Sequence, residues 1–350
     1  MRRHHCGVPR RHSKMQRMSH VVRIYVVASL LFAAGTSRAA DPPTPEIKTA
    51  RLSDIWMRDA CILPDEGTRT YYLVASAQSG VRLYTSQDLV NWEGPHIVYR
   101  TPREMWGDNV DIRSIWAPEI HAYKGRYYLF LTFDSTAKFP EQWRNWRPRV
   151  RRGCQVLVSD SPLGPYRPFS NEPTLPADMM TLDGTLWVED GVPWMVYCHE
   201  WVQIVNGTVE RMRLKDDLSA TVGEPERMFF GSDAKWNRPS REYGCWVTDG
   251  PWLYRGKSGK LFMTWSSFSE SGYTVGLAVA ESGKLAGPWT QQREPIYKKD
   301  GGHSMLFRRF DGQLMMALHS PNNGRKERIH LFEMEDTGET LRIVREFTGN

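Results

Sequence analysis

The chain of 350 residues carries 46 lysine and arginine residues against 40 aspartate and glutamate residues, a net charge of +6. Eight of the basic residues and none of the acidic ones lie within residues 1–40, so the remaining 310 residues carry a net charge of −2. This body is not basic, which excludes the nucleic-acid or membrane-surface role that the total charge suggests. Intrinsic disorder is excluded as well, because 40% of the chain is hydrophobic and 12% is aromatic.

Residues 1–40 are typical of a secretory signal peptide. Basic residues precede the apolar run 24–34, and Ser37 and Ala39 put small residues at the −3 and −1 positions of a cleavage site. Eleven apolar residues are too few to span a bilayer comfortably, which argues against the alternative of an uncleaved membrane anchor. We expect residues 1–40 to be a signal peptide, residues 41–50 a linker, and the protein to be secreted or periplasmic without stable membrane insertion.

Four cysteines lie in the body of the chain, where export would permit disulfide bonds. Cys61, Cys154, Cys198 and Cys245 are widely spaced and contain no C-x-x-C pair, so zinc-type spacing is absent. The simplest interpretation is that they are small buried apolar residues.

A weak repeat of about 60 residues occurs five times after the leader. Each copy has a polar residue and a short apolar strand, then a turn with glycine and a second, very apolar strand. The expected first strands are residues 59–64, 117–123, 183–188, 249–254 and 303–308. The expected second strands are residues 71–75, 127–131, 194–198, 261–265 and 314–318. Third strands are expected at residues 80–86, 154–159 and 273–280, each followed by an aromatic residue that starts a fourth strand.

Four-stranded units repeated around an axis form a β-propeller. The sequence therefore predicts an all-β fold, a five-bladed β-propeller in a single domain of residues 51–350. The main alternative, a pair of β-sandwiches, gives no reason for acidic residues to recur at one place in each unit.

The starts of the first strands are expected to meet at one mouth of the central channel. Five side chains would converge there: Asp59, Glu119, Asp183, Asp249 and His303. The loops between second and third strands open on the same face, so Glu200 and Trp201 are expected to point into the mouth as well. The insertion 139–149, which contains Trp143 and Trp146, would form part of its rim.

Several carboxylates in one cleft cannot all remain equally ionised, because repulsion and burial spread their pKa values apart. One carboxyl can then hold a proton while another acts as a base, which is what cleavage of a glycosidic bond requires. The chain's 14 tryptophans fit this interpretation, since flat aromatic faces can pack against sugar rings, although most belong in blade cores. Any single acidic residue has a plain alternative as a turn or cap residue, so the recurrence carries the argument.

Four segments together resemble glycoside hydrolase family 43, a five-bladed family of arabinanases, α-L-arabinofuranosidases and β-xylosidases. They are Arg58-Asp59-Ala60-Cys61-Ile62-Leu63, Trp116-Ala117-Pro118-Glu119-Ile120, Thr248-Asp249-Gly250-Pro251 and Ser86-Gln87-Asp88-Leu89-Val90-Asn91-Trp92. The resemblance covers the chain from about Trp56 to its end. It implies a glycosidase that acts with inversion on arabinofuranosyl, xylosyl or similar residues of a poly- or oligosaccharide.

The resemblance also implies roles for single residues. Asp59 matches the general base, and Asp183 matches by position the aspartate that tunes the acid. The general acid of the family is a glutamate directly before Gly-Pro, where this chain has Asp249, which is one methylene shorter. A misplacement of about 1 Å can cost about 100-fold in rate, so three alternatives follow: the pocket suits Asp249, Glu200 has taken over, or the site is not catalytic.

Further expectations concern binding. Five residues are expected to contact the substrate: Trp116, Glu119, Trp201, Trp143 and Trp146. The resemblance implies that His303 helps to hold a calcium ion or a water molecule near the axis, and no other cofactor is expected. Arginines of the insertion 139–149 could steer acidic sugars such as uronates. A retaining fructosidase-like enzyme and a non-catalytic sugar-binding propeller remain as alternative functions.

Overall fold

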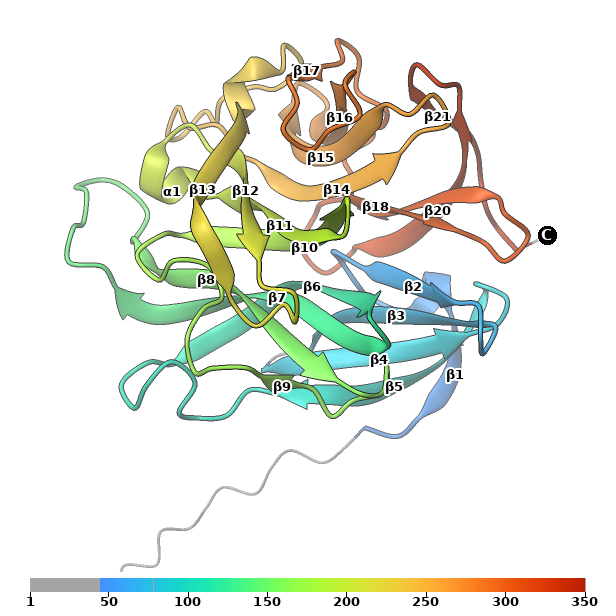
Figure 1. Ribbon diagram of the computed structural model, residues 1–350, viewed down its shortest axis with the longest axis horizontal. Helices are drawn as coiled ribbons and strands as arrows, with labels where there is room; N and C mark the ends of the chain where they lie inside the picture. The colour runs from blue at the N-terminus through green and yellow to red at the C-terminus, as the bar shows by residue number, and fades with distance from the viewer. Residues whose placement is uncertain (1–44, 78, 350) are drawn as a thin grey trace, which may run out of the picture. The chain divides into compact units, whose positions relative to one another are not determined.

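The computed structural model describes residues 45–77 and 79–349, so the predicted signal peptide lies outside the described residues. Within these ranges, 21 strands form five antiparallel sheets that follow one another along the chain (Figure 1). The innermost strand of each sheet contacts the innermost strand of the next, and the fifth contacts the first. The sheets are therefore the blades of a five-bladed β-propeller, as predicted. None of the helices in this part of the chain is long and apolar enough to cross a membrane.

Each blade consists of consecutive strands. The first contains β1 (Lys48–Arg51), β2 (Cys61–Asp65), β3 (Thr70–Ala77), β4 (Gly80–Ser86) and β5 (Asn91–Arg100), and the second contains β6 (Ile112–Tyr123), β7 (Arg126–Lys138), β8 (Val150–Ser159) and β9 (Arg167–Pro168). The third contains β10 (Thr181–Glu189), β11 (Val192–His199), β12 (Thr208–Leu214) and β13 (Thr221–Phe230). The fourth contains β14 (Asp249–Arg255), β15 (Leu261–Ser269), β16 (Gly272–Ala280) and β17 (Trp289–Gln291). The fifth contains β18 (Gly302–Arg308), β19 (Leu314–Ser320), β20 (Arg328–Asp336) and β21 (Leu341–Glu346). Short helices lie at Leu52–Asp54, Trp201–Ile204 (α1) and Gly231–Asp233.

The second strand of each blade is mostly apolar in its central part because it is buried on both faces. In β15, for example, residues 261–267 are all buried. The turns before these strands are set by local chemistry. Lys124 and Gly125, like Asp190 and Gly191, have positive φ at both positions, the pattern of a two-residue type I′ hairpin turn. Apolar patterning and turn residues together explain why the predicted first and second strands match the observed ones closely.

Two boundary predictions can be compared with this architecture. Residues 48–51 form β1, which pairs with residues 91–94 at the outer edge of the first blade. The prediction of a linker over residues 41–50 is therefore wrong for its last three residues. The interpretation of the cysteines is confirmed: Cys61, Cys154, Cys198 and Cys245 are all buried and none forms a disulfide.

The ring of blades closes without a shared sheet. No sheet of the described chain combines strands from its two ends. The segment before β2 instead bonds to the start of β20: Trp56 Nε1 donates to Glu327 Oε2 (3.0 Å), and Arg328 Nε donates to the Ser53 carbonyl (2.9 Å). These contacts place residues 56–59 next to the fifth blade, which brings the start of the first blade to the channel.

Candidate active site

A β-bulge near the start of the inner strand positions the residues at the channel mouth. The pairing register shifts in the inner strand of four blades: between Trp116 and Glu119 in β6, between Leu182 and Thr185 in β10, between Asp249 and Trp252 in β14, and between Gly302 and Met305 in β18. One residue in each shift has positive φ: Ala117 (39°), Asp183 (56°), Gly250 (50°) and His303 (51°). Asp59, two residues before β2, has φ of 51° as well. These five positions are structurally equivalent.

This equivalence corrects one prediction. Glu119 and Asp249 do not occupy the same place in their blades as Asp59 and Asp183. In the fourth blade the equivalent position is Gly250, and Asp249 comes one residue before it. In the second blade the equivalent position is Ala117, and Glu119 comes two residues after it. The bulges define the equivalent positions, and the acids of the second and fourth blades stand at other positions relative to them.

Two adjoining cavities lie at this mouth. An inner pocket of about 380 Å³ is lined by Asp59, Asp183, Glu200, Asp249 and His303, among others. An outer cleft of about 1030 Å³ shares four lining residues with it: Arg58, Trp116, Asp249 and Tyr273. The prediction that carboxylates from different blades converge at one place is confirmed for Asp59, Asp183, Asp249 and Glu200.

Asp59 has neighbours at both of its carboxylate oxygens. Its Oδ2 accepts a hydrogen bond from Arg58 Nε (2.9 Å), and its backbone N–H donates to His319 Nδ1 (3.3 Å). Its Oδ1 lies near two imidazole rings, 3.2 Å from His319 Nδ1 and 3.5 Å from His303 Nδ1. Burial alone would raise the pKa of Asp59, but the charges of His303 and Arg58 and the contact with His319 outweigh it and hold the pKa well below its usual range. Asp59 is thus an ionised carboxylate that lines the inner pocket.

Asp183 is more deeply buried. Its Oδ2 accepts a hydrogen bond from the Gly250 N–H (2.9 Å), and its own N–H donates to Thr132 Oγ1 (2.9 Å). Burial raises its pKa well above the usual range, the Gly250 bond opposes this, and the charge of Asp59 adds to it. Asp183 therefore links the inner strands of the third and fourth blades directly beside Asp249.

Asp249 lines both cavities, so it can face a bond that lies between them. Its Oδ2 accepts a hydrogen bond from the Tyr273 hydroxyl (2.9 Å). Burial, followed by the charge of Asp183, raises the pKa of Asp249 to about 7. A large fraction of this side chain is consequently protonated at neutral pH.

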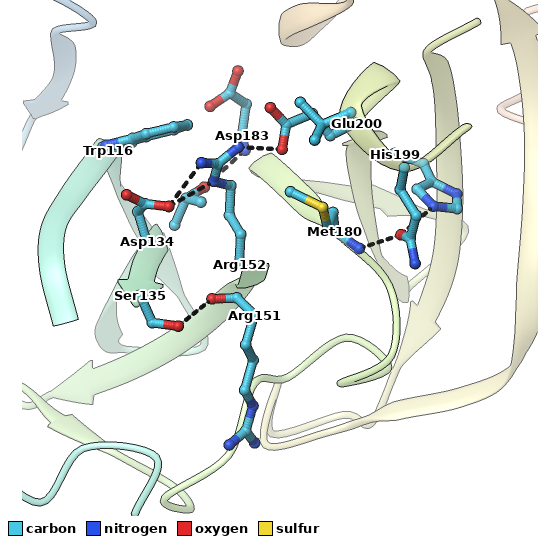
Figure 2. A network of polar contacts seen from close by, with 12 residues as sticks. Trp116, Asp134, Ser135, Arg151, Arg152, Met180, Asp183, His199 and Glu200 are labelled. Atoms are coloured by element: carbon cyan, nitrogen blue, oxygen red, sulfur yellow. Dashed lines mark hydrogen bonds and ion pairs between the residues drawn. The ribbon is translucent and has the colours of Figure 1, made fainter. Parts of the chain in front are cut away.

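Glu200 belongs to a buried ionic network. It follows β11 and precedes α1, as expected for a loop that opens on the mouth. Its carboxylate pairs with Arg152, whose guanidinium also bonds to Asp134 (2.7 Å). Figure 2 shows Arg152 between these two acids, with Trp116 beside it, and the Trp116 ring centre lies 4.0 Å from Arg152 Cζ. Burial raises the pKa of Glu200, while Arg152 opposes that rise and favours the charged form.

The other predicted binding residues separate into two groups. Trp116 lines both cavities and Trp201 lines the outer cleft. Glu119 lies outside both linings and bonds to His121 Nε2 (2.8 Å). Trp143 and Trp146 also lie outside both linings, and Trp146 instead packs edge-on against Trp201 with ring centres 5.7 Å apart. Direct contact of these three with substrate stays a prediction.

The expectation that His303 helps to hold a calcium ion or a water molecule stays a prediction. Its Nδ1 lies 3.5 Å from Asp59 Oδ1 and 3.8 Å from Asp183 Oδ2. His303 is placed to interact with the two aspartates.

Sequence reasoning missed several residues of the site: Arg58 as a partner of Asp59, Asp134, Arg152, Tyr273 and His319. One signal was available. The second strands of four blades run from apolar residues into a polar end, at Asp134, His199, Ser266 and His319. These ends lie at the mouth, so a polar residue that closes an apolar second strand marks this face of the propeller.

The ionic network predicts a strong effect on stability. In an Arg152→Met variant, Asp134 and Glu200 would remain buried without the partner they share. We expect a loss of about 3–5 kcal/mol in the free energy of unfolding, measured by urea denaturation. The control is Arg342→Met, which removes the exposed pair with Glu335 and should cost under about 1 kcal/mol. Equal losses in the two variants would contradict a structural role for the network.

The fold and the mouth together define a class of protein. A five-bladed propeller whose blades bring paired carboxylates into one pocket has the framework of a glycosidase. The sequence model described as "Glycosyl hydrolases family 43" matches residues 55–339. The chain therefore belongs to glycosyl hydrolases family 43, which confirms the resemblance and the expected class, a glycosidase that hydrolyses O-glycosyl compounds.

Three proteins with a named activity are similar to this chain. The crystal structure of an endo-arabinase from Bacteroides thetaiotaomicron superimposes with a TM-score of 0.72 at 37% identity, covering 81% of this chain and 96% of that one. Extracellular exo-alpha-(1->5)-L-arabinofuranosidase ArbA of Cellvibrio japonicus is 25% identical over 256 residues, 68% of this chain and 67% of that protein. Alpha-L-arabinofuranosidase B of Pyricularia oryzae is 26% identical over 188 residues, 52% of this chain but only 36% of that protein.

Proposed function

We propose that this protein hydrolyses the O-glycosidic bonds of arabinofuranosyl, xylosyl or similar residues in a poly- or oligosaccharide, with inversion of configuration. One observation carries the proposal: an Asp59 whose pKa lies well below its usual range and an Asp249 with a pKa of about 7 line the same inner pocket. Two carboxyl groups in opposite protonation states are what an inverting glycosidase needs.

Asp59 is the general base in this proposal. Its Oδ1 accepts a proton from the water that attacks the anomeric carbon, while the Arg58 bond holds Oδ2 and fixes the carboxylate. The low pKa keeps Asp59 ionised through the neutral range.

Asp249 is the general acid, and it donates its proton to the oxygen of the leaving sugar. Glu200 is less suited to this step, because its carboxylate is bound to Arg152 and, unlike Asp249, it lines the inner pocket only. Asp183 tunes Asp249: the two neighbouring carboxyl groups cannot both ionise without repulsion, and this repulsion is the second cause, after burial, of the raised pKa of Asp249. The shorter aspartate side chain is supported in place by the Tyr273 hydroxyl.

The substrate class has two lines of support. The similar proteins are named as arabinofuranosidases and an endo-arabinase. The outer cleft offers Trp116, Trp201 and Tyr243 as flat faces against which sugar rings can pack. We also infer that the protein is exported to the periplasm or the medium, on the strength of the predicted leader in residues 1–40 and of a similar protein named as extracellular.

A screen of 4-nitrophenyl glycosides tests the proposal. The panel contains α-L-arabinofuranoside, β-D-xyloside and β-D-fructofuranoside, followed by linear and branched arabinans and xylans. We expect release of 4-nitrophenol from the arabinofuranoside or the xyloside, and none from an Asp59→Asn/Asp249→Asn double variant. Binding of arabino-oligosaccharides by calorimetry without cleavage of any substrate would overturn the proposal and favour a sugar-binding propeller.

A further inference from the structure

The outer cleft carries more positive charge than its own carboxylates neutralise. Four arginines line it: Arg58, Arg147, Arg238 and Arg241. Arg58 pairs with Asp59 (2.9 Å), and Arg238 pairs with Glu270 (3.1 Å). Among the described residues, no carboxylate lies within ion-pair distance of Arg147 or Arg241.

The acidic residues of the cleft do not cancel these two arginines. Its lining contains three of them, Asp249, Glu242 and Glu270. Glu270 is taken by Arg238, and Asp249 has a pKa of about 7. Glu242 adjoins Arg241 in the chain but forms no ion pair with it. An anionic group in this cleft would therefore meet two guanidinium groups that no carboxylate of the described residues pairs with.

Arg147 is held at the cleft by the insertion that carries it. Trp146 Nε1 donates to the Val202 carbonyl (2.7 Å), and Arg149 donates to the Gln203 carbonyl (2.9 Å), so the insertion is bonded to α1 on both sides of Arg147. The Arg147 guanidinium lies 5.8 Å from the centre of the Tyr243 ring. This ring packs against Trp201, with 5.5 Å between ring centres, so the charge stands beside an aromatic wall.

We propose that the outer cleft binds a sugar that carries a carboxylate, a uronic acid residue, through Arg147 and Arg241. The planar guanidinium matches a carboxylate with two parallel hydrogen bonds, and the rings of Trp201 and Tyr243 can receive the apolar face of the same sugar. The inference rests on the proposed function, because the uronate would belong to the chain whose neighbouring bond is cleaved in the inner pocket. It names an acidic polysaccharide as the substrate.

The test uses two substrates that differ only in charge. One is a plant arabinogalactan that bears glucuronic acid and arabinofuranosyl residues, and the other is the same polymer after reduction of each carboxyl to a primary alcohol. We expect the wild-type kcat/KM for the acidic polymer to exceed that for the reduced polymer by about tenfold or more. The preference should shrink as salt rises.

Variants assign the effect to the two arginines. Arg147→Gln/Arg241→Gln should abolish the ratio between the two polymers. The control Arg213→Gln/Arg227→Gln, an equal charge change at exposed positions of β12 and β13, should leave the ratio intact. Binding to the Asp59→Asn variant gives a second measurement that needs no turnover: oligosaccharides from the acidic polymer should bind about tenfold or more tightly than their reduced forms.

The outcomes separate this inference from the proposed function. If wild-type enzyme cleaves a neutral aryl glycoside but treats the two polymers alike, the uronate site is wrong and the glycosidase proposal stands. If nothing is cleaved, the glycosidase proposal fails, and the binding measurement still decides on the uronate site. A charge preference that persists in the double arginine variant would also overturn the assignment.

Discussion

Asp59→Asn is expected to lower kcat/KM by about 10²–10⁴-fold on every substrate that the enzyme accepts, whatever its leaving group. An asparagine at this place keeps the size of the side chain but cannot take the proton of the attacking water. The ionised carboxylate in the inner pocket is the proton acceptor that the variant removes. The measurement is the release of 4-nitrophenol together with reducing-sugar assays on the polymer.

Folding must be measured in the same variant, because Asp59 is also a charge partner of Arg58 and His303. A lowered pKa in the folded state means that the ionised group contributes stability at neutral pH, and that this contribution is lost as the pH falls through the folded pKa. Asp59→Asn should therefore melt somewhat lower than wild type at pH 7 but remain folded at 25 °C. Asp54→Asn, an exposed acid before the same strand, is the control. Undiminished turnover in folded Asp59→Asn would remove the base assignment.

Asp249→Asn is expected to lose about 10²–10⁴-fold on substrates with a sugar leaving group, and far less on a 2,4-dinitrophenyl glycoside. A dinitrophenolate departs without protonation, so the variant should keep part of its activity on this substrate. Glu200→Gln is the comparison, since Glu200 is the alternative acid. It should lower the rate on both kinds of substrate by similar factors, because it disturbs a carboxylate held by Arg152.

The pH profile gives Asp249 a second signature. The active form is protonated, so kcat/KM should fall as the pH rises above the Asp249 pKa of about 7. Asp59 must be ionised, and its low pKa places the acid-side fall far below neutrality. In Asp249→Asn, assayed on the dinitrophenyl glycoside, the alkaline fall should disappear. A fall that persists there but disappears in Glu200→Gln would transfer the acid role to Glu200.

Much of the fold follows from local sequence patterns. Apolar second strands and glycine turns predict the blades, and the recurring polar starts predict that Asp59, Asp183 and Asp249 meet. The third strands β12 and β20 were not expected, because charged residues such as Arg213 and Glu333 interrupt their apolar pattern. The inner-strand bulges were missed as well, since nothing in composition marks Ala117 or His303 for positive φ.

The ionic network shows why part of the site was beyond prediction. The apolar pattern predicts that the second strand of the second blade ends at residue 131, and the polar, aromatic stretch 139–149 is typical of an insertion. The observed hairpin of β7 and β8 continues beyond that point and places Asp134 directly opposite Arg152. Such a cross-strand pair depends on the register of the two strands. The hydrophobic pattern of a strand fixes its register only where one face of the sheet is buried and the other is exposed. Glu200 then joins from the loop between β11 and α1, a contact set by the packing of the second blade against the third.

The central claim is that an ionised Asp59 activates water against a bond whose leaving oxygen is protonated by Asp249. Proton NMR of the first product formed from an aryl glycoside tests it most directly, because spectra recorded before mutarotation show which anomer the enzyme releases. The account predicts the anomer of inverted configuration. A product that first appears with retained configuration would mean that a side chain of the pocket acts as a nucleophile, and would contradict the assignment of Asp59 as a base.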